Sequence, residues 1–187
     1  MKTGIDAHSL GSRQSGNETY YRSLLTSLAR VDSENDYFIY HTKGGATEEA
    51  ARKIADVLRS KYQLEVDLVD LREQKVLDLA QYRSVVIGGG VRGGRVYSKV
   101  LKFLKNDFSG KQIAFFTSSS WAGTPGSYEN AKAKFVENTL AKYPNINPIS
   151  TEAFGGRIRI LRKTMLDNTD LAKVDAWAEE LGKKFTE

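Results

Sequence analysis

The stretch from Thr42 to Thr47, Thr-Lys-Gly-Gly-Ala-Thr, has the residue types of an anion-binding loop. It follows the apolar, aromatic run 37–40, and a helical pattern begins at Thr47. Backbone N–H groups at the start of a helix have no internal partner, and the helix dipole favours negative charge there. Gly44 and Gly45 allow a ligand to approach closely. The stretch therefore predicts a phosphate-monoester site, although an ordinary turn with Thr47 as N-cap explains the same residues.

Two later segments have the same glycine- and hydroxyl-rich composition. Residues 88–95 follow the apolar run 83–88, and residues 117–126 follow the apolar run 112–117. In a parallel sheet, ligands bind beyond the carboxyl ends of the strands. The segments expected at the opposite edge of the sheet lack this composition. This asymmetry predicts a single ligand site built from three loops.

Apolar runs alternate with helical patterns from residue 37 onward, which predicts an α/β fold. The expected architecture is a three-layer, doubly wound parallel sheet with right-handed crossovers. A turn is expected at 154–157, and residues 1–36 are expected to form an additional N-terminal strand–loop–helix unit. The five expected strands are 37–41, 64–69, 83–88, 112–117 and 146–154, and the expected helices begin at Thr47, near Tyr97, at Ser127 and near Asp170.

The composition of the chain excludes several kinds of binding site and partner. The chain has 187 residues, a formal charge of +5, no cysteine and two histidines. This excludes disulfides, thiolate metal sites and a three-histidine metal site. Basic residues are interspersed with acidic ones, which indicates a solvated surface and not a nucleic-acid stripe. No apolar run reaches the roughly 20 residues of a membrane span, and we expect a cytoplasmic protein.

Several ligand classes fit the three loops less well than a mononucleotide with a flat ring. Gly88, Gly90 and Gly93 satisfy G-x-G-x-x-G, but a dinucleotide fingerprint belongs to the first strand–helix unit and needs an acidic residue after the next strand. No Gly-Lys-Ser or Gly-Lys-Thr occurs, and no G-x-S-x-G elbow is present. Trp121 is placed to stack on a ring or simply to pack. No residue is a candidate general acid or base.

Residues 37–187 resemble a flavodoxin-type domain, within the flavodoxin-domain group that includes protoporphyrinogen-oxidase-like proteins. The resemblance covers about four fifths of the chain. It implies strand order 2-1-3-4-5, a bound FMN and a redox or electron-transfer role with an unknown redox partner. Any enzymatic activity would be that of an FMN-dependent oxidoreductase. The matching stretches are 40–47, 85–88 with 91–95, 110–116, 154–157 and the closing helix that contains Trp177.

The resemblance also implies which residues contact FMN, and it implies no catalytic or metal-binding residue. The net positive charge of the chain differs from that of small acidic electron carriers and argues against docking to basic partners. The implied phosphate contacts are Thr42, Lys43, Gly44, Gly45, Ala46 and Thr47. The implied isoalloxazine contacts are Gly89, Gly90, Val91, Arg92, Gly93, Gly94, Ser118, Ser119, Ser120, Trp121 and Gly123.

Residues 1–41 resemble the N-terminus of a nucleotide-sugar glycosyltransferase through the stretches 4–11, 15–21 and 36–40. The catalytic parts of such a transferase are missing. We therefore expect a chimera joined at the strand 37–41, whose added strand lies at a sheet edge or is exchanged between protomers in a homo-oligomer. The alternatives to FMN binding are a chimera with an empty or weakened flavin site and a module for another phosphorylated ligand.

Overall fold

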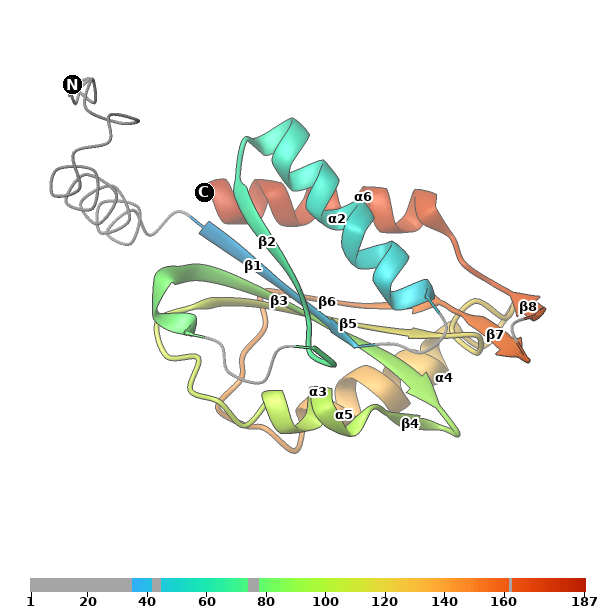
Figure 1. Ribbon diagram of the computed structural model, residues 1–187. Coiled ribbons are helices and arrows are strands. Elements are labelled where there is room, and N and C mark those ends of the chain that lie inside the picture. Colours follow the sequence, from blue (N-terminus) through green and yellow to red (C-terminus); the bar gives the residue numbers. More distant parts are fainter. Residues whose placement is uncertain (1–34, 42–44, 74–77, 162) are drawn as a thin grey trace, which may run out of the picture. The chain divides into compact units, whose positions relative to one another are not determined.

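A five-stranded parallel sheet forms the centre of the domain in the computed structural model (Figure 1). The structure describes residues 35–41, 45–73, 78–161 and 163–187. The strand and helix expected within residues 1–34 therefore lie outside the described residues, as do Thr42, Lys43 and Gly44.

The strand order is β2-β1-β3-β5-β6, which confirms the predicted 2-1-3-4-5 arrangement. β1 pairs in parallel with β2 on one side and with β3 on the other, so both of its edges are occupied within the sheet. The five parallel strands are β1 (Asn35–His41), β2 (Glu65–Asp70), β3 (Tyr82–Arg92), β5 (Gln112–Ser119) and β6 (Ser150–Gly155).

Helices cover both faces of the sheet (Figure 1). α2 (Ala46–Tyr62) and α6 (Leu171–Thr186) lie on one face. α2 has acidic residues in its first turn and basic residues in its last, which complements the helix dipole. α6 begins at Asp170, whose side chain accepts a hydrogen bond from the Lys173 N–H. The opposite face carries α3 (Ser98–Phe103) and the segment formed by α4 (Tyr128–Lys132), a π-helical turn (Ala133–Glu137) and α5 (Asn138–Leu140).

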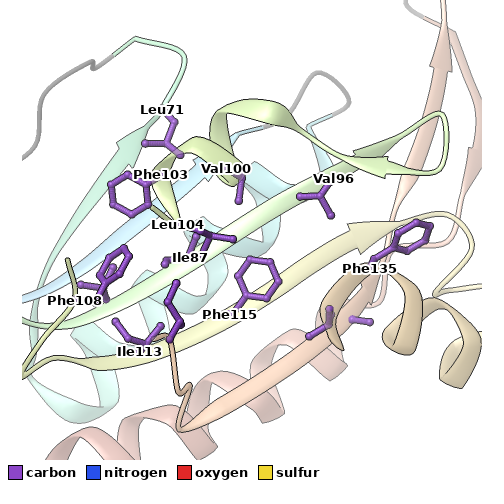
Figure 2. Packing of buried hydrophobic residues seen from close by; sticks show 14 of the residues in the cluster. Leu71, Ile87, Val96, Val100, Phe103, Leu104, Phe108, Ile113, Phe115 and Phe135 are labelled. Atoms are coloured by element: carbon purple, nitrogen blue, oxygen red, sulfur yellow. The ribbon is translucent and has the colours of Figure 1, made fainter. Parts of the chain in front are cut away.

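Each face of the sheet has its own apolar cluster. On the α2/α6 face, Phe116, Phe154 and Trp177 form a mutual aromatic contact with ring centroids 5.3–5.8 Å apart. On the other face, side chains of α3 pack over Ile87 and Phe115 (Figure 2). Alternate residues of a strand point to opposite faces, and the buried runs in β3 and β5 supply both clusters at once.

The glycine-rich segment 88–95, expected to be a flexible loop, is mostly strand. β3 continues through the three glycines, and β4 (Arg95–Val96) pairs back on it antiparallel after a turn at Gly93 and Gly94. A Cβ atom at Gly88 would lie 2.4 Å from Cζ of Phe116. The glycines therefore serve close packing within the strand, which composition alone does not distinguish from flexibility.

The C-terminal third also differs from expectation. The predicted strand 146–154 is shorter at its start: Pro148 has no N–H to donate, and the pairing of β6 with β5 begins at Ser150. The expected turn at 154–157 contains the end of β6 and the start of a hairpin. This hairpin, β7 (Arg157–Ile160) with β8 (Lys163–Asp167), forms a separate antiparallel sheet that was not predicted.

Candidate functional site

A cavity of about 850 Å³ opens at the carboxyl edge of the parallel sheet. Its wall combines the start of α2, the end of β3 with the turn to β4, the end of β5 with the following loop, the π-helical turn and the β7–β8 hairpin. β4 and the hairpin lie at the same end of the sheet (Figure 1). The described lining residues are Ala46, Thr47, Gly90, Val91, Arg92, Gly93, Gly94, Tyr97, Ser118, Ser119, Ser120, Trp121, Lys134, Phe135, Gly156, Arg157, Ile158 and Arg159.

The start of α2 forms one end of this cavity. Gly45 is the N-cap residue, with a left-handed φ of 84°, and its carbonyl accepts the first helical hydrogen bond from the Glu49 N–H at 2.9 Å. The sequence interpretation with Thr47 as N-cap is therefore wrong. A left-handed N-cap suits glycine because a side chain would be strained there. Thr47, the second residue of α2, is almost fully buried and lines the cavity wall.

The end of β5 brings hydroxyl groups to the cavity floor. Ser118 is 4% exposed, and its Oγ has no hydrogen-bond partner among the residues that the structure describes. The neighbouring Ser119 Oγ accepts a hydrogen bond from the Ala122 N–H at 3.0 Å. A buried hydroxyl without a partner costs free energy unless a ligand or water satisfies it. Ser118 therefore marks a point at which a polar ligand atom fits.

Aromatic side chains form the wall after β5. Trp121 is 36% exposed and meets Phe135 edge-on, with ring centroids 5.6 Å apart. Nζ of Lys134 lies 5.3 Å from the Trp121 ring centroid, within the range of a cation–π contact. Trp121 thus packs on the protein and also borders the cavity.

Two arginines of β7 reach the cavity with different surroundings. Arg157 donates to Asp167 Oδ2 at 2.6 Å and to Glu49 Oε2 at 3.0 Å, which ties the hairpin to α2. The hydrogen bond to Asp167 raises the pKa of Arg157. Arg159 is exposed, and its Nη1 would lie 3.6 Å from a Cβ atom at Gly45. Arg159 has no ion pair within the described part of the chain, and its charge faces the first turn of α2.

Most of the predicted contact residues that are described line this one cavity. Gly45 adjoins it as the N-cap of α2. Gly89 and Gly123 are not among the lining residues: a Cβ at Gly89 would meet Val96 at 3.0 Å, and one at Gly123 would meet the carbonyl oxygen of Asn168 at 2.4 Å. Both glycines allow close backbone packing behind the wall.

The sequence interpretation missed the part of the lining that comes from Tyr97, the π-helical turn and the hairpin. Within residues 157–159 the alternation of arginine with isoleucine is a strand signal that was available. The charge of the lining was also not foreseen. It includes four cationic side chains, and among the described lining residues none is a carboxylate.

The flavodoxin domain family matches residues 37–183, from within β1 to within α6. The chain belongs to this family. No curated protein sequence matches the chain. The findings do not support the glycosyltransferase-like N-terminal segment or the chimera. The division at residue 36 stays a prediction.

Two solved flavodoxins and an oxidoreductase share the fold of this flavodoxin domain at low sequence identity. Oxidised flavodoxin 1 from Bacillus cereus is 19% identical, with a TM-score of 0.56, over 80% of this chain and 97% of that chain. A flavodoxin from Streptococcus pneumoniae is 18% identical, with a TM-score of 0.55, over 80% and 98%. Rubredoxin oxygen:oxidoreductase from Desulfovibrio gigas is 12% identical, with a TM-score of 0.56, over 91% of this chain and 41% of that one.

Two further observations bear on the kind of site. No helix within the described ranges is long and apolar enough to cross a bilayer. No group of three or more His, Cys, Asp or Glu side chains that would hold a metal ion occurs among the described residues.

Proposed function

We propose that this flavodoxin domain binds FMN and serves in electron transfer. The observation that carries the proposal is the cavity itself. It lies at the carboxyl edge of a 2-1-3-4-5 sheet and joins the N-terminus of α2 to a wall that holds a buried, unpartnered hydroxyl and an exposed tryptophan. Family membership supports the same ligand class.

The phosphate end of the ligand belongs at the start of α2. The first N–H groups of the helix point into this region and have no intrahelical acceptor. Arg159 adds a positive charge that the described carboxylates do not neutralise, close to Gly45. A phosphate monoester carries about 1.5 to 2 negative charges at pH 7, which suits this combination. The contacts implied for Thr42, Lys43 and Gly44 remain part of the proposal.

The flat ring belongs between the turn after β3 and the loop after β5. Trp121 and Tyr97 border this part of the cavity, and Ser118 offers a hydroxyl on its floor. Backbone groups of Gly90 to Gly94 provide polar contacts without the bulk of side chains at the glycines. When bound, FMN supplies one- and two-electron transfer. The residues of this chain hold the ligand, exclude water from one side of it and set its electrostatic surroundings.

The proposal is tested by titrating purified protein with FMN and following flavin fluorescence and visible absorbance. We expect quenching with a 1:1 endpoint and a shift of the flavin absorbance bands. Riboflavin, which lacks the phosphate, should bind more weakly, and AMP should not compete at similar concentration. Absence of quenching by FMN rejects the redox function. Binding of AMP in preference to FMN would instead identify a module for another phosphorylated ligand.

A further inference from the structure

The β7–β8 hairpin exposes an unusual amount of apolar surface. Leu161 at its tip is 93% exposed, and Met165 is 65% exposed. Ile158, Ile160 and Leu166 of the hairpin are exposed as well, whereas outside the hairpin the exposed large apolar side chains of the described residues are Trp121, Ile149 and Leu171. Contiguous exposed apolar patches on a folded domain commonly mark interaction sites. The exposed apolar residues of this region are Ile158, Ile160, Leu161, Met165, Leu166 and Leu171.

Cationic side chains flank this apolar surface on both sides of the cavity. On one wall, the β3–β4 turn carries Arg92 and Arg95, paired across the two strands and both exposed. A Cβ at Gly94, in the same turn, would lie 3.9 Å from Nζ of Lys134. On the other side, Lys163 is exposed on β8, which pairs with the cavity-lining strand β7 but does not itself line the cavity. We call a set of exposed residues on the three elements that border the cavity (the β3–β4 turn, the segment after β5 and the hairpin) the mouth face; it consists of Arg92, Arg95, Trp121, Lys134, Ile158, Ile160, Leu161, Lys163 and Met165.

We propose that the mouth face docks a small acidic electron-transfer protein. The inference rests on the proposed FMN function, because a redox partner must approach the cavity opening to exchange an electron with the flavin. An apolar centre with a charged rim has the composition of a transient protein interface. The rim is cationic, so complementarity requires a negatively charged partner surface. A partner of this class would carry a one-electron centre such as an iron–sulfur cluster; one electron would pass between that centre and the flavin, with one oxidised as the other is reduced.

Two other occupants fit this face less well. A second copy of this chain would oppose its own cations at the same positions, and like charges across an interface are unfavourable. A lipid surface suits an apolar hairpin tip with basic flanks. However, a flat bilayer that contacts Leu161 at the hairpin tip would not depend on contact with Arg95 on the β3–β4 turn. Participation of both walls therefore distinguishes a docked protein from a membrane.

The test measures complex formation between the FMN-loaded protein and an oxidised plant-type [2Fe–2S] ferredoxin, used as an acidic probe, by calorimetric titration at low and high salt. We expect the dissociation constant to rise about tenfold or more with salt because exposed charges are screened. Arg95→Glu and Lys163→Glu should each weaken binding about tenfold. The matched double variant Lys105→Glu/Lys142→Glu changes exposed lysines that precede β5 and β6, at the opposite edge of the sheet, and should bind like the wild type.

Three results would overturn the proposal. Ferredoxin binding that is absent, or that falls equally in the Lys105→Glu/Lys142→Glu control, shows no specific docking at the mouth face. Stronger binding to basic cytochrome c than to ferredoxin reverses the inferred charge. Binding to phosphatidylglycerol vesicles that depends on Lys163 but not on Arg95, without ferredoxin binding, assigns the hairpin to a lipid surface. Flavin content is measured beforehand for every variant, so a failure of FMN binding is recognised separately from a failure of docking.

Discussion

In the proposed FMN complex, the charge of Arg159 is what would distinguish a phosphorylated flavin from an unphosphorylated one. We predict that Arg159→Gln lowers FMN affinity about tenfold or more, because a hydrogen bond to a charged group contributes about 1.5–3 kcal/mol. Riboflavin affinity should change little, since riboflavin has no phosphate. Fluorescence titrations with the two flavins give both values.

Lys163→Gln removes the same charge from the same hairpin and is the control for Arg159. It lies outside the cavity lining, and its effect on FMN affinity should stay below about twofold at moderate salt. Equal losses of FMN and riboflavin affinity in Arg159→Gln would show that Arg159 supports the cavity wall instead of the phosphate.

The two buried hydroxyls at the end of β5 make a matched pair. Both Thr117 Oγ1 and Ser118 Oγ lack a partner among the described residues, but only Ser118 lines the cavity. We predict that Ser118→Ala leaves the unfolding free energy of the cofactor-free protein unchanged or raises it by up to about 1 kcal/mol, because an unsatisfied polar group is removed. The same change should weaken FMN binding roughly three- to tenfold.

Thr117→Val should likewise preserve or raise stability but leave FMN affinity unchanged. Urea unfolding without cofactor and flavin titration measure the two quantities independently. If Thr117→Val weakens FMN binding as much as Ser118→Ala does, the effect comes from the strand and not from a hydroxyl at the cavity.

At this scale the sequence allowed prediction of the residues that follow their strands directly. Thr47, Ser118 and Trp121 lie in the short segments that follow recognisable apolar runs, so the topology places them at one edge. Arg159 was beyond reach because it follows β6 in a hairpin of its own and approaches Gly45 across more than a hundred residues of chain. Only the folded structure brings the two together.

An ion-paired arginine joins the hairpin to α2. This contact affects the stability of the domain whether or not a ligand is bound. Arg157 bridges Asp167 of β8 and Glu49 of α2, with 15% of its side chain exposed. We predict that Arg157→Gln lowers the unfolding free energy at pH 7 by about 1 kcal/mol, at the modest end for charged hydrogen bonds because the Asp167 side chain is 37% exposed. Lys163→Gln, the control, should stay within about 0.5 kcal/mol of the wild type.

The stability contributed by the Arg157–Asp167 ion pair should decrease in acid. Hydrogen bonds from Thr169 and then from Arg157 lower the pKa of Asp167. A lowered carboxyl pKa gives stability that is present above the unfolded value of about 3.9 and lost as pH falls through the folded value. The destabilisation by Arg157→Gln should therefore shrink when urea unfolding is repeated near pH 3. An undiminished difference at pH 3 would show that Arg157 acts by packing alone.

Helices and strands were predictable where the apolar residues of the periodic pattern are also the ones that are buried in the structure. The helices predicted from Thr47 and from Asp170 show one apolar stripe each, and both begin within one residue of the predicted start. β3 was cut short at Gly88 because glycine reads as a loop signal, whereas here it admits the Phe116 ring. The hairpin escaped prediction because its apolar residues are exposed, and burial patterns do not describe such a strand.

For the whole molecule, alternation predicted the parallel sheet and the family resemblance implied its strand order. The pH dependence of the domain's stability follows instead from tertiary contacts. Burial, and then a hydrogen bond to Asp67, raises the pKa of Tyr82; burial, and then a hydrogen bond to Glu152, raises that of Tyr128. The hydroxyl-to-carboxylate distances are 2.7 and 2.6 Å. These tyrosines lie on different elements, so their contribution appears only when the domain unfolds as a unit.

These raised pKa values determine whether the unfolding free energy rises or falls at alkaline pH. Above about pH 10 the tyrosines ionise in the unfolded chain but stay protonated in the folded one, so the folded state binds more protons and stability falls as pH rises. Each tyrosine contributes a slope of up to about 1.4 kcal/mol per pH unit.

We predict that Tyr82→Phe/Tyr128→Phe is less stable than the wild type at pH 8, where two hydrogen bonds are lost, and that the difference narrows between pH 10 and 11. Urea unfolding of cofactor-free protein measures both slopes. Parallel slopes would mean that other groups, such as the lysines, govern alkaline unfolding.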